Sequence, residues 1–197
     1  MSNECEFFNK IADKWDNTRA VDVDKIAGLV AMIDLEPGFA VLDAGSGTGV
    51  LLPFIKEAVG PAGQITAVDF SANMLAKAKE KYGHLGDITF AVVDIMEFVP
   101  ENGLFDAVIC FNFFPHIKDK QGFMTHMQSH LRQGGFLVIM HDISRQQVNA
   151  IHKDSEAVKN DRLASGETVG SWLTTAGYQV TQIVDTGDRY FIRAVKP

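Results

Sequence analysis

The sequence predicts an α/β fold: a three-layer, doubly wound sandwich in which helices cover both faces of a seven-stranded, mostly parallel β-sheet. Short apolar runs alternate with longer amphipathic stretches along the chain, which is typical of strand–helix repeats. Several of these runs are almost continuously apolar, as parallel strands buried on both faces are. A glycine-rich turn also follows the first strong apolar run and leads into a helix, which is the usual junction in such folds.

The expected strands fall into two groups. The first five are apolar and are joined through helices, so their crossovers are expected to be right-handed. The last two alternate polar and apolar residues and flank the short polar stretch DTGD (185–188), which favours an antiparallel hairpin at a sheet edge. In chain order the expected strands are 39–44, 64–70, 88–94, 105–111, 135–141, 178–184 and 189–195.

The expected helices lie between these strands. The helix after the glycine-rich turn ends at Gly60, and the next one begins at Ser71 as its N-cap and ends before Gly83. Further helices are expected over 119–131, 144–158 and 167–176. The N-terminal segment, residues 1–30, contains FFNKIADKWDN, whose apolar residues have helical spacing, and we expect a helical lid or a helix packed on the body.

Composition limits the class of protein. A chain of 197 residues without repeats or linkers is expected to form a single domain over 1–197, as a monomer or homodimer. The net charge of −7 and the scattered basic residues argue against a nucleic-acid partner. No apolar run is long enough to span a membrane, no signal peptide is evident, and Cys5 and Cys110 suggest no disulfide framework, so we expect a cytoplasmic protein.

The stretch DAGSGTG (43–49) predicts a ligand site. Glycine permits positive φ in a tight turn, and without a Cβ it lets a ligand lie against the backbone. The dinucleotide fingerprint G-x-G-x-x-G would need a third glycine at position 50, where the chain has Val50. The pattern therefore argues against a pyrophosphate-binding site, although a nicotinamide-dependent reductase on a related fold remains an alternative.

DAGSGTG resembles the first motif of class I S-adenosylmethionine-dependent methyltransferases. VDFSANML (68–75) resembles the second motif of their small-molecule members, including the ubiquinone/menaquinone C-methylase group. VVDIMEF (92–98), FDAVICFNFFPHI (105–117) and LRQGGFLVIMHD (131–142) are similar to later motifs, so that the resemblance covers roughly residues 7 to 195.

This resemblance implies S-adenosyl-L-methionine as the cofactor and the strand order 3-2-1-4-5-7-6, with strand 7 antiparallel. Asp43 would lie near the amino group of the cofactor and Asp69 would hold the ribose hydroxyls. Phe70 would flank the adenine, and Asp94 would bind its amino group with Ile95 packed nearby. The full set of implied cofactor-binding residues is Asp43, Gly45, Gly47, Gly49, Asp69, Phe70, Met74, Asp94, Ile95 and Phe111.

Polar residues that follow the fourth and fifth strands are the candidates for the methyl acceptor. Methyl transfer depends on holding the nucleophile in line with the methyl group, and a base is needed only when the nucleophile must lose a proton. His116 follows the fourth strand and His141 ends the fifth. Arg145, Asn149 and His152 share one stripe of the next helix. We expect these two histidines, together with Asn149 and His152, to form a polar acceptor pocket with Arg145 beside it. The alternative is a solvated helix face beside a strand-capping histidine.

Three histidines also raise the question of a metal. Zinc accepts imidazoles from separate elements, so a site of His116, His141 and His152 stays open, but the spacing carries no metal signature and no metal is expected. The stretch CFNFFPH (110–116) differs from the NPPY-type motif of enzymes that methylate nucleic-acid bases, which favours a small-molecule acceptor. A non-catalytic S-adenosylmethionine-binding protein is the remaining alternative.

Overall fold

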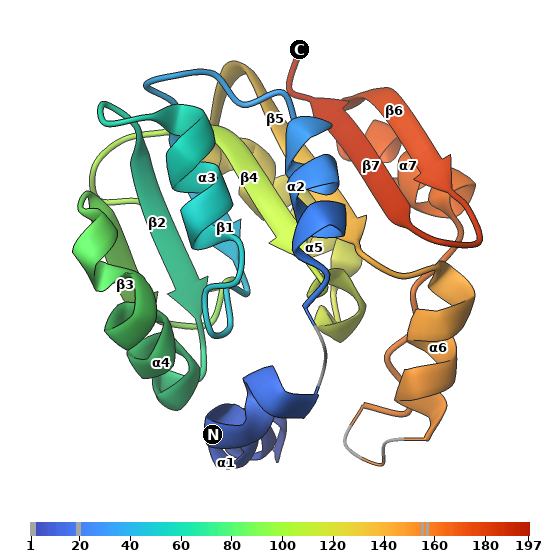
Figure 1. Ribbon diagram of the computed structural model, residues 1–197. Coiled ribbons are helices and arrows are strands. Elements are labelled where there is room, and N and C mark those ends of the chain that lie inside the picture. Colours follow the sequence, from blue (N-terminus) through green and yellow to red (C-terminus); the bar gives the residue numbers. More distant parts are fainter. Residues whose placement is uncertain (1–2, 19–20, 155, 157) are drawn as a thin grey trace. The chain divides into compact units, whose positions relative to one another are not determined.

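The computed structural model describes residues 3–18, 21–154, 156 and 158–197 (Figure 1). The chain folds as two compact units, Met1–Phe98 (unit 1) and Val99–Pro197 (unit 2), and each is described by itself. A single domain over 1–197 therefore stays a prediction. The strands are β1 (Ala40–Ala44), β2 (Gln64–Asp69) and β3 (Ile88–Val92) in unit 1, and β4 (Phe105–Phe111), β5 (Leu131–His141), β6 (Gln179–Asp185) and β7 (Tyr190–Val195) in unit 2.

The strands form a seven-stranded sheet in the order β3-β2-β1-β4-β5-β7-β6. β7 runs antiparallel to both β5 and β6, whereas β1, β2 and β3 pair in parallel, as do β4 and β5. The predicted fold class, strand order and antiparallel strand 7 are confirmed. The helices are α1 (Asn3–Thr18), α2 (Val23–Ala31), α3 (Leu52–Val59), α4 (Ala72–Tyr82), α5 (Lys120–His130), α6 (Arg145–Lys153) and α7 (Gly166–Thr175), with 3-10 turns η1 (Gly83–Leu85) and η2 (Phe114–His116).

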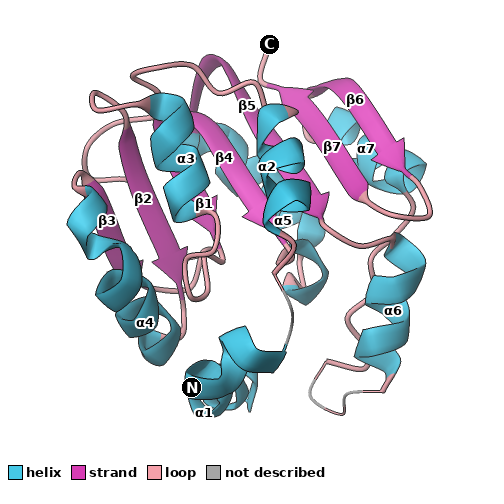
Figure 2. Ribbon diagram, viewed as in Figure 1, coloured by secondary structure: helices cyan, strands magenta, loops and turns pink. Residues whose placement is uncertain are grey.

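In unit 1, helices pack on a three-stranded parallel sheet (Figure 2). α3 packs on β1 and β2, α4 packs on β2 and β3, and α1 packs on α4. The inner strands are apolar and buried, with Val41, Leu42, Ala67 and Val68 fully inaccessible, because helices cover them.

The third strand is shorter than predicted. It ends at Val92 rather than at Asp94. Oδ1 of Asp94 accepts a hydrogen bond from the backbone N–H of Met96, and its backbone oxygen accepts one from Glu97. These local bonds turn the chain away from the sheet, so Asp94 lies in the loop that follows β3.

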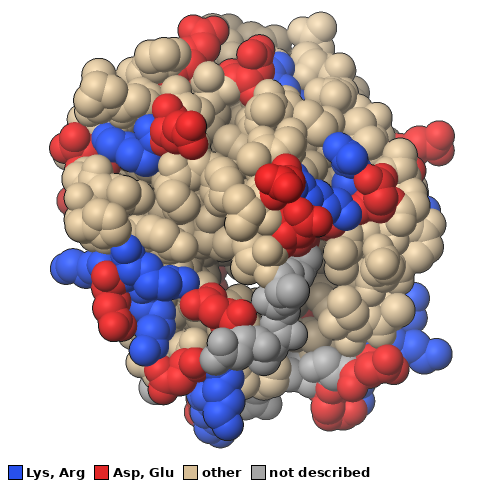
Figure 3. All heavy atoms as spheres, in the orientation of Figure 1, with Lys and Arg blue, Asp and Glu red and all other residues tan. Residues whose placement is uncertain are grey.

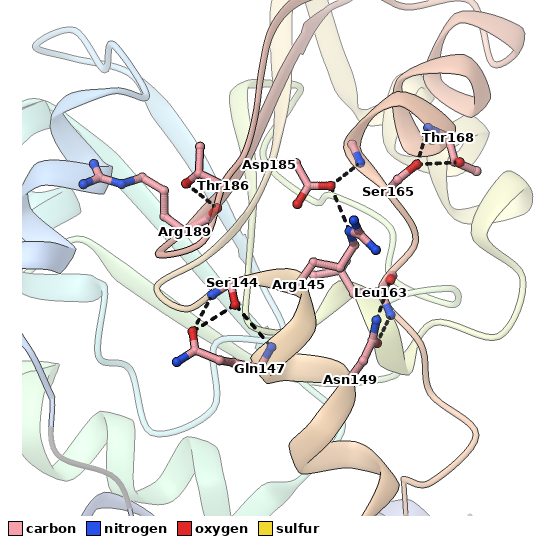
Figure 4. Close-up of polar contacts among 11 residues, drawn as sticks. Ser144, Arg145, Gln147, Asn149, Leu163, Ser165, Thr168, Asp185, Thr186 and Arg189 are labelled. Atoms are coloured by element: carbon pink, nitrogen blue, oxygen red, sulfur yellow. Dashed lines mark hydrogen bonds and ion pairs between the residues drawn. The ribbon is translucent and has the colours of Figure 1, made fainter.

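In unit 2, α7 packs on β6 and β7 and α5 packs on β5. α6 begins with a capping box in which Ser144 and Gln147 bond each other's backbone N–H groups (Figure 4). The sequence predicted this helix to continue to residue 158, but it ends at Lys153. On this helix Val148 is buried, whereas Ile151 is 59% exposed.

Charged side chains of both signs are interspersed on the face seen in Figure 3. Ion pairs such as Lys77–Asp13 in unit 1 and Arg132–Asp106 in unit 2 match this distribution. On this face no stripe of one sign dominates, as the scattered basic residues of the sequence led us to expect. Of the helices that the structure describes, none combines the length and the apolar character required to cross a bilayer.

Candidate functional site

The glycine loop of unit 1, residues 45–49, connects β1 to α3. Gly45, Gly47 and Gly49 all have positive φ, at 70°, 54° and 82°. A Cβ on Gly49 would lie 2.8 Å from Cδ1 of Leu52 and 3.0 Å from Cβ of Ala78, whereas one on Gly47 would meet no described atom within 4 Å. Gly49 is therefore required for packing inside the protein, and Gly47 leaves the backbone open to a ligand.

Two buried polar atoms beside this loop lack hydrogen-bond partners among the described residues: Oδ2 of Asp43 and Oγ of Ser46. Asp43 is only 2% exposed. Burial, with a smaller effect from the charge of Asp69, raises the pKa of Asp43 to about 7. Buried polar atoms are almost always bonded, so this pair suits a ligand that brings a cationic donor and a further polar group.

Asp69, the last residue of β2, fixes the conformation of the glycine loop. Its Oδ2 accepts from the backbone N–H of Gly47 at 2.9 Å, and its Oδ1 accepts from that of Ser71 at 2.8 Å. Ser71 in turn caps α4 by accepting from the N–H of Met74. Each carboxylate oxygen has a second acceptor position, so these bonds are compatible with ribose hydroxyls, which stay a prediction.

The other predicted cofactor residues lie in varied environments. Phe70 is half-buried and its ring centroid lies 5.9 Å from that of Phe8 on α1. Met74 and Ile95 are buried and Asp94 is exposed. Phe111 ends β4, in unit 2, and is buried there.

The N-terminal helix is bonded to the same region of unit 1. Oδ1 of Asn9 accepts from Oγ of Ser71 at 2.8 Å, and Asp16 accepts from Oγ1 of Thr48 in the glycine loop at 2.6 Å. Lys81 of α4 pairs with the other oxygen of Asp16. Burial opposes ionisation of Asp16, but the bonds from Lys81 and Thr48 outweigh it and lower its pKa. A lid over 1–30 stays a prediction, and residues 1–2 and 19–20 lie outside the described residues.

In unit 2, four side chains form a cluster that we call the histidine cluster: His116, Lys118, His152 and Asp161. Nδ1 of His116 lies 2.8 Å from Oδ2 of Asp161, and Nζ of Lys118 lies 2.6 Å from Oδ1. Nδ1 of His152 lies 2.6 Å from the backbone oxygen of Asp161, and the two imidazole centroids are 5.0 Å apart. The side chain of Asp161 is 3% exposed, so a buried carboxylate organises the cluster.

Arg145 and Asn149, the other predicted acceptor residues on α6, bond to the protein (Figure 4). Nε of Arg145 donates to Oδ2 of Asp185 at 2.8 Å, an oxygen that also accepts from the N–H of Gly166. The side chain of Asn149 both donates to and accepts from the backbone of Leu163, at 3.0 and 2.8 Å. This pairing holds the chain that returns along α6, which is the physical reason why the helix does not continue to residue 158.

His141 belongs to a row of residues across three strands. Tyr190 of β7 pairs in register with both His141 of β5 and Asp185 of β6, and the rings of His141 and Tyr190 meet edge to face at 5.9 Å. The hydroxyl of Tyr190, Oδ1 of Asp185 and Oδ1 of Asn112 are buried and have no hydrogen-bond partner among the described residues. Burial and the charge of Asp185 raise the pKa of Tyr190, which keeps its hydroxyl protonated.

The three histidines for which a metal site was left open lie in two different environments. Among the described residues, no group of three or more His, Cys, Asp or Glu side chains is arranged to hold a metal ion. His116 and His152 both meet Asp161, whereas His141 packs on Tyr190. The set of His116, His141 and His152 is therefore divided between two environments.

Sequence reasoning missed several of these residues. Asp161 lies in a charged stretch away from any strand end, and nothing in the sequence distinguishes it from its neighbours. Asn9 and Asp16 were detectable, since they lie seven residues apart, on one stripe of the predicted N-terminal helix. Tyr190 and Asp185 were also detectable, because they flank the turn of the predicted hairpin.

The chain is similar in sequence to known proteins. Residues 41–135 match a family model described as a methyltransferase domain. A demethylmenaquinone methyltransferase of Staphylococcus aureus is 30% identical over 138 residues, which cover 68% of this chain and 57% of that relative. The chain thus matches little more than half the length of this curated relative.

Two solved structures have similar folds. A S-adenosylmethionine-dependent methyltransferase from Aquifex aeolicus superposes with a TM-score of 0.70 at 21% identity, over 96% of this chain and 98% of that one. The N-methyltransferase NodS from Bradyrhizobium japonicum, in complex with S-adenosyl-L-homocysteine, superposes with a TM-score of 0.74 at 17% identity, over 100% of both chains.

Proposed function

The chain belongs to the class I S-adenosylmethionine-dependent methyltransferases, and from this membership we propose that it transfers a methyl group from S-adenosylmethionine to a small-molecule acceptor. One observation of the structure carries the proposal: beside a glycine loop at the end of β1, Oδ2 of Asp43 and Oγ of Ser46 are buried without partners among the described residues. These atoms suit the two charged groups at the amino-acid end of this cofactor.

Unit 1 would hold the cofactor through groups of complementary chemistry. The Asp43 carboxylate would accept from the ammonium group, and Ser46 and the backbone N–H groups of the glycine loop would donate to the carboxylate. The position of Gly47, where a Cβ would meet no described atom within 4 Å, supports close approach of a ligand to the backbone. Asp69 and Asp94 would bind the sugar and the base, with the apolar contacts in unit 1 supplied by Phe70, Met74 and Ile95.

The bound cofactor supplies a methyl group activated by a sulfonium. Unit 2 would contribute by binding the acceptor and excluding water from it. The hydroxyl of Tyr190, Oδ1 of Asp185 and Oδ1 of Asn112, all buried without partners among the described residues, support an acceptor with several polar groups. Arg145 and Asn149 would act indirectly, because their side chains bond to Asp185 and Leu163.

We also propose that no nucleic acid, membrane or metal takes part in the reaction and that the protein acts in the cytoplasm as a monomer or homodimer. The interspersed surface charges of Figure 3 support the first point. The buried thiols of Cys5 and Cys110 are consistent with a reducing compartment.

Isotope transfer tests the proposal. The full chain is incubated with methyl-labelled S-adenosylmethionine and a small-molecule extract, and label that moves into an organic product identifies the acceptor. We expect transfer that S-adenosylhomocysteine inhibits and that Asp43→Asn reduces at least about tenfold, as loss of a charged hydrogen-bond partner implies. Binding of the cofactor without any transfer would indicate a non-catalytic binding protein instead.

A further inference from the structure

Asp161 holds two histidine rings in the same tautomer. Its side chain accepts from Nδ1 of His116 at 2.8 Å, and its backbone oxygen accepts from Nδ1 of His152 at 2.6 Å. A carboxylate and a carbonyl can only accept, so each Nδ1 carries the proton while its ring is neutral. The lone pair of each neutral ring is therefore on Nε2.

The charges around the cluster favour an ionised Asp161 carboxylate and a neutral His152. Burial opposes ionisation of Asp161, but the hydrogen bonds from His116 and Lys118 outweigh it and hold its pKa below the usual value. Burial lowers the pKa of His152, so that ring stays neutral. Lys120, whose pKa is lowered by burial, is a further cation near Asp161, and it donates to the backbone oxygen of Ile117.

We propose that His116 is the base that removes a proton from the methyl acceptor and that Asp161 is its positioning residue; this inference rests on the methyl transfer proposed above. In this step an O–H, S–H or N–H bond of the acceptor breaks and the electron pair stays on the acceptor atom. The proton joins Nε2 of His116 and later passes to water. The imidazolium lies against the Asp161 carboxylate, which offsets its charge as in a catalytic triad.

The geometry also limits the class of acceptor. A tertiary amine or a thioether has no proton to lose and needs no base, whereas a phenol, a thiol or a ring N–H does. A buried carboxylate that orients an imidazole through Nδ1 is suited to the second group. The acceptor is therefore a protic nucleophile. The neutral ring of His152, 5.0 Å from that of His116, adds no positive charge to oppose formation of the imidazolium.

Histidine tautomers measured by long-range ¹H–¹⁵N NMR test the geometry without cofactor or acceptor. In the full chain at pH 7.5, we expect His116 and His152 to carry the proton on Nδ1, with signals assigned from His116→Asn and His152→Asn. An Nε2–H tautomer of His116 in the unaltered protein would overturn the proposal.

The Asp161→Asn substitution should change the tautomer of His116 in a predictable direction. Lys118 can only donate, so it retains the amide oxygen and turns the amide NH₂ toward His116, which forces His116 into the Nε2–H tautomer. His152, bonded to the backbone of residue 161, should keep its tautomer. Asp119→Asn is the matched control, because Asp119 caps α5 in the same unit and Asn caps a helix equally well. An unchanged His116 signal in Asp161→Asn would contradict the assignment.

Methyl transfer into the acceptor found by isotope labelling tests the base itself. The amide of His116→Asn keeps a donor for Asp161 but has no basic nitrogen, so we expect transfer to fall about 100-fold or more at pH 7.5 with an unchanged thermal midpoint. His152→Asn should lose less than about tenfold. Full transfer by His116→Asn would show that the cluster only holds the chain around residue 161. If no transfer occurs in any variant while the tautomers are as expected, the proposed function fails and the geometry stands.

Discussion

The glycine loop of unit 1 and the histidine cluster of unit 2 differ in whether their buried polar atoms have hydrogen-bond partners. Beside the loop, Oδ2 of Asp43 and Oγ of Ser46 are buried without partners among the described residues. In the cluster, both oxygens of the Asp161 side chain and its backbone oxygen accept bonds from the protein. Unpaired buried atoms are costly and indicate a place where a ligand completes the bonding, whereas a carboxylate bonded through both of its oxygens orients other groups.

The substitutions Gly49→Ala and Gly47→Ala test whether the two glycines have different roles in the loop. Their expected effect on the free energy of unfolding is the largest of the predictions. Both impose positive φ on alanine, but only Gly49→Ala forces a Cβ to within 2.8 Å of Leu52. We expect Gly49→Ala to lower the free energy of unfolding by about 3 kcal/mol and Gly47→Ala by about 1 kcal/mol. Urea denaturation gives both values, and equal losses would argue against separate roles for the two glycines.

Asn149→Ala tests whether the polar side chain of Asn149 on α6 stabilises unit 2. Its side chain makes two bonds to the backbone of Leu163, and their loss should lower the free energy of unfolding by about 2 kcal/mol and speed amide exchange at Leu163. Gln146→Ala, at an exposed position of the same helix, is the control. If Asn149→Ala were as stable as that control yet failed to transfer methyl groups, Asn149 would contact the acceptor instead.

The pH dependence of S-adenosylhomocysteine binding tests the unpaired carboxylate, with the smallest expected effect. The pKa of Asp43 is about 7, and an ammonium ligand favours its ionised form. Affinity should therefore rise about eightfold between pH 6 and 7.5, with release of a proton on binding at pH 6. Asp43→Asn should abolish both effects, and their persistence in that variant would assign the proton to another group.

The same raised pKa affects the stability of the protein without ligand. Because the folded state binds the proton of Asp43 more tightly than the unfolded chain does, this group's contribution is fully present below pH 3.8 and is lost as the pH rises through about 7. Bound ligand should oppose that loss, since it compensates the buried charge.

Features set by neighbouring residues were predictable from the sequence. Apolar runs and capping residues act locally, so the antiparallel hairpin and helix α4 with its Ser71 cap were confirmed. The strand order was confirmed as well, but the family resemblance implied it, not the local pattern. The wrong element boundaries result from hydrogen bonds that the pattern of apolar and capping residues does not reveal. Helix α6 ends early because the chain returns to pair with Asn149, and β3 ends early because Asp94 forms a local turn.

The same distinction applies to the candidate site, where the glycine loop was predictable and the histidine cluster was not. The glycine loop is contiguous in the sequence, and three glycines in alternation behind a strand indicate it directly. The histidine cluster depends on Asp161, which is 45 residues from His116 along the chain. The sequence therefore supplied the histidines without the carboxylate that orients them.

Calorimetric titration of the full chain with S-adenosylhomocysteine, and separately with NADH, tests the central claim most directly. We expect saturable binding of S-adenosylhomocysteine and none of NADH. Asp69→Asn should weaken binding at least about tenfold, because its single side-chain oxygen cannot accept from both Gly47 and Ser71. Failure to bind S-adenosylhomocysteine, or binding of NADH that Asp69→Asn weakens, would contradict the assignment of this loop to a methyl-donor cofactor.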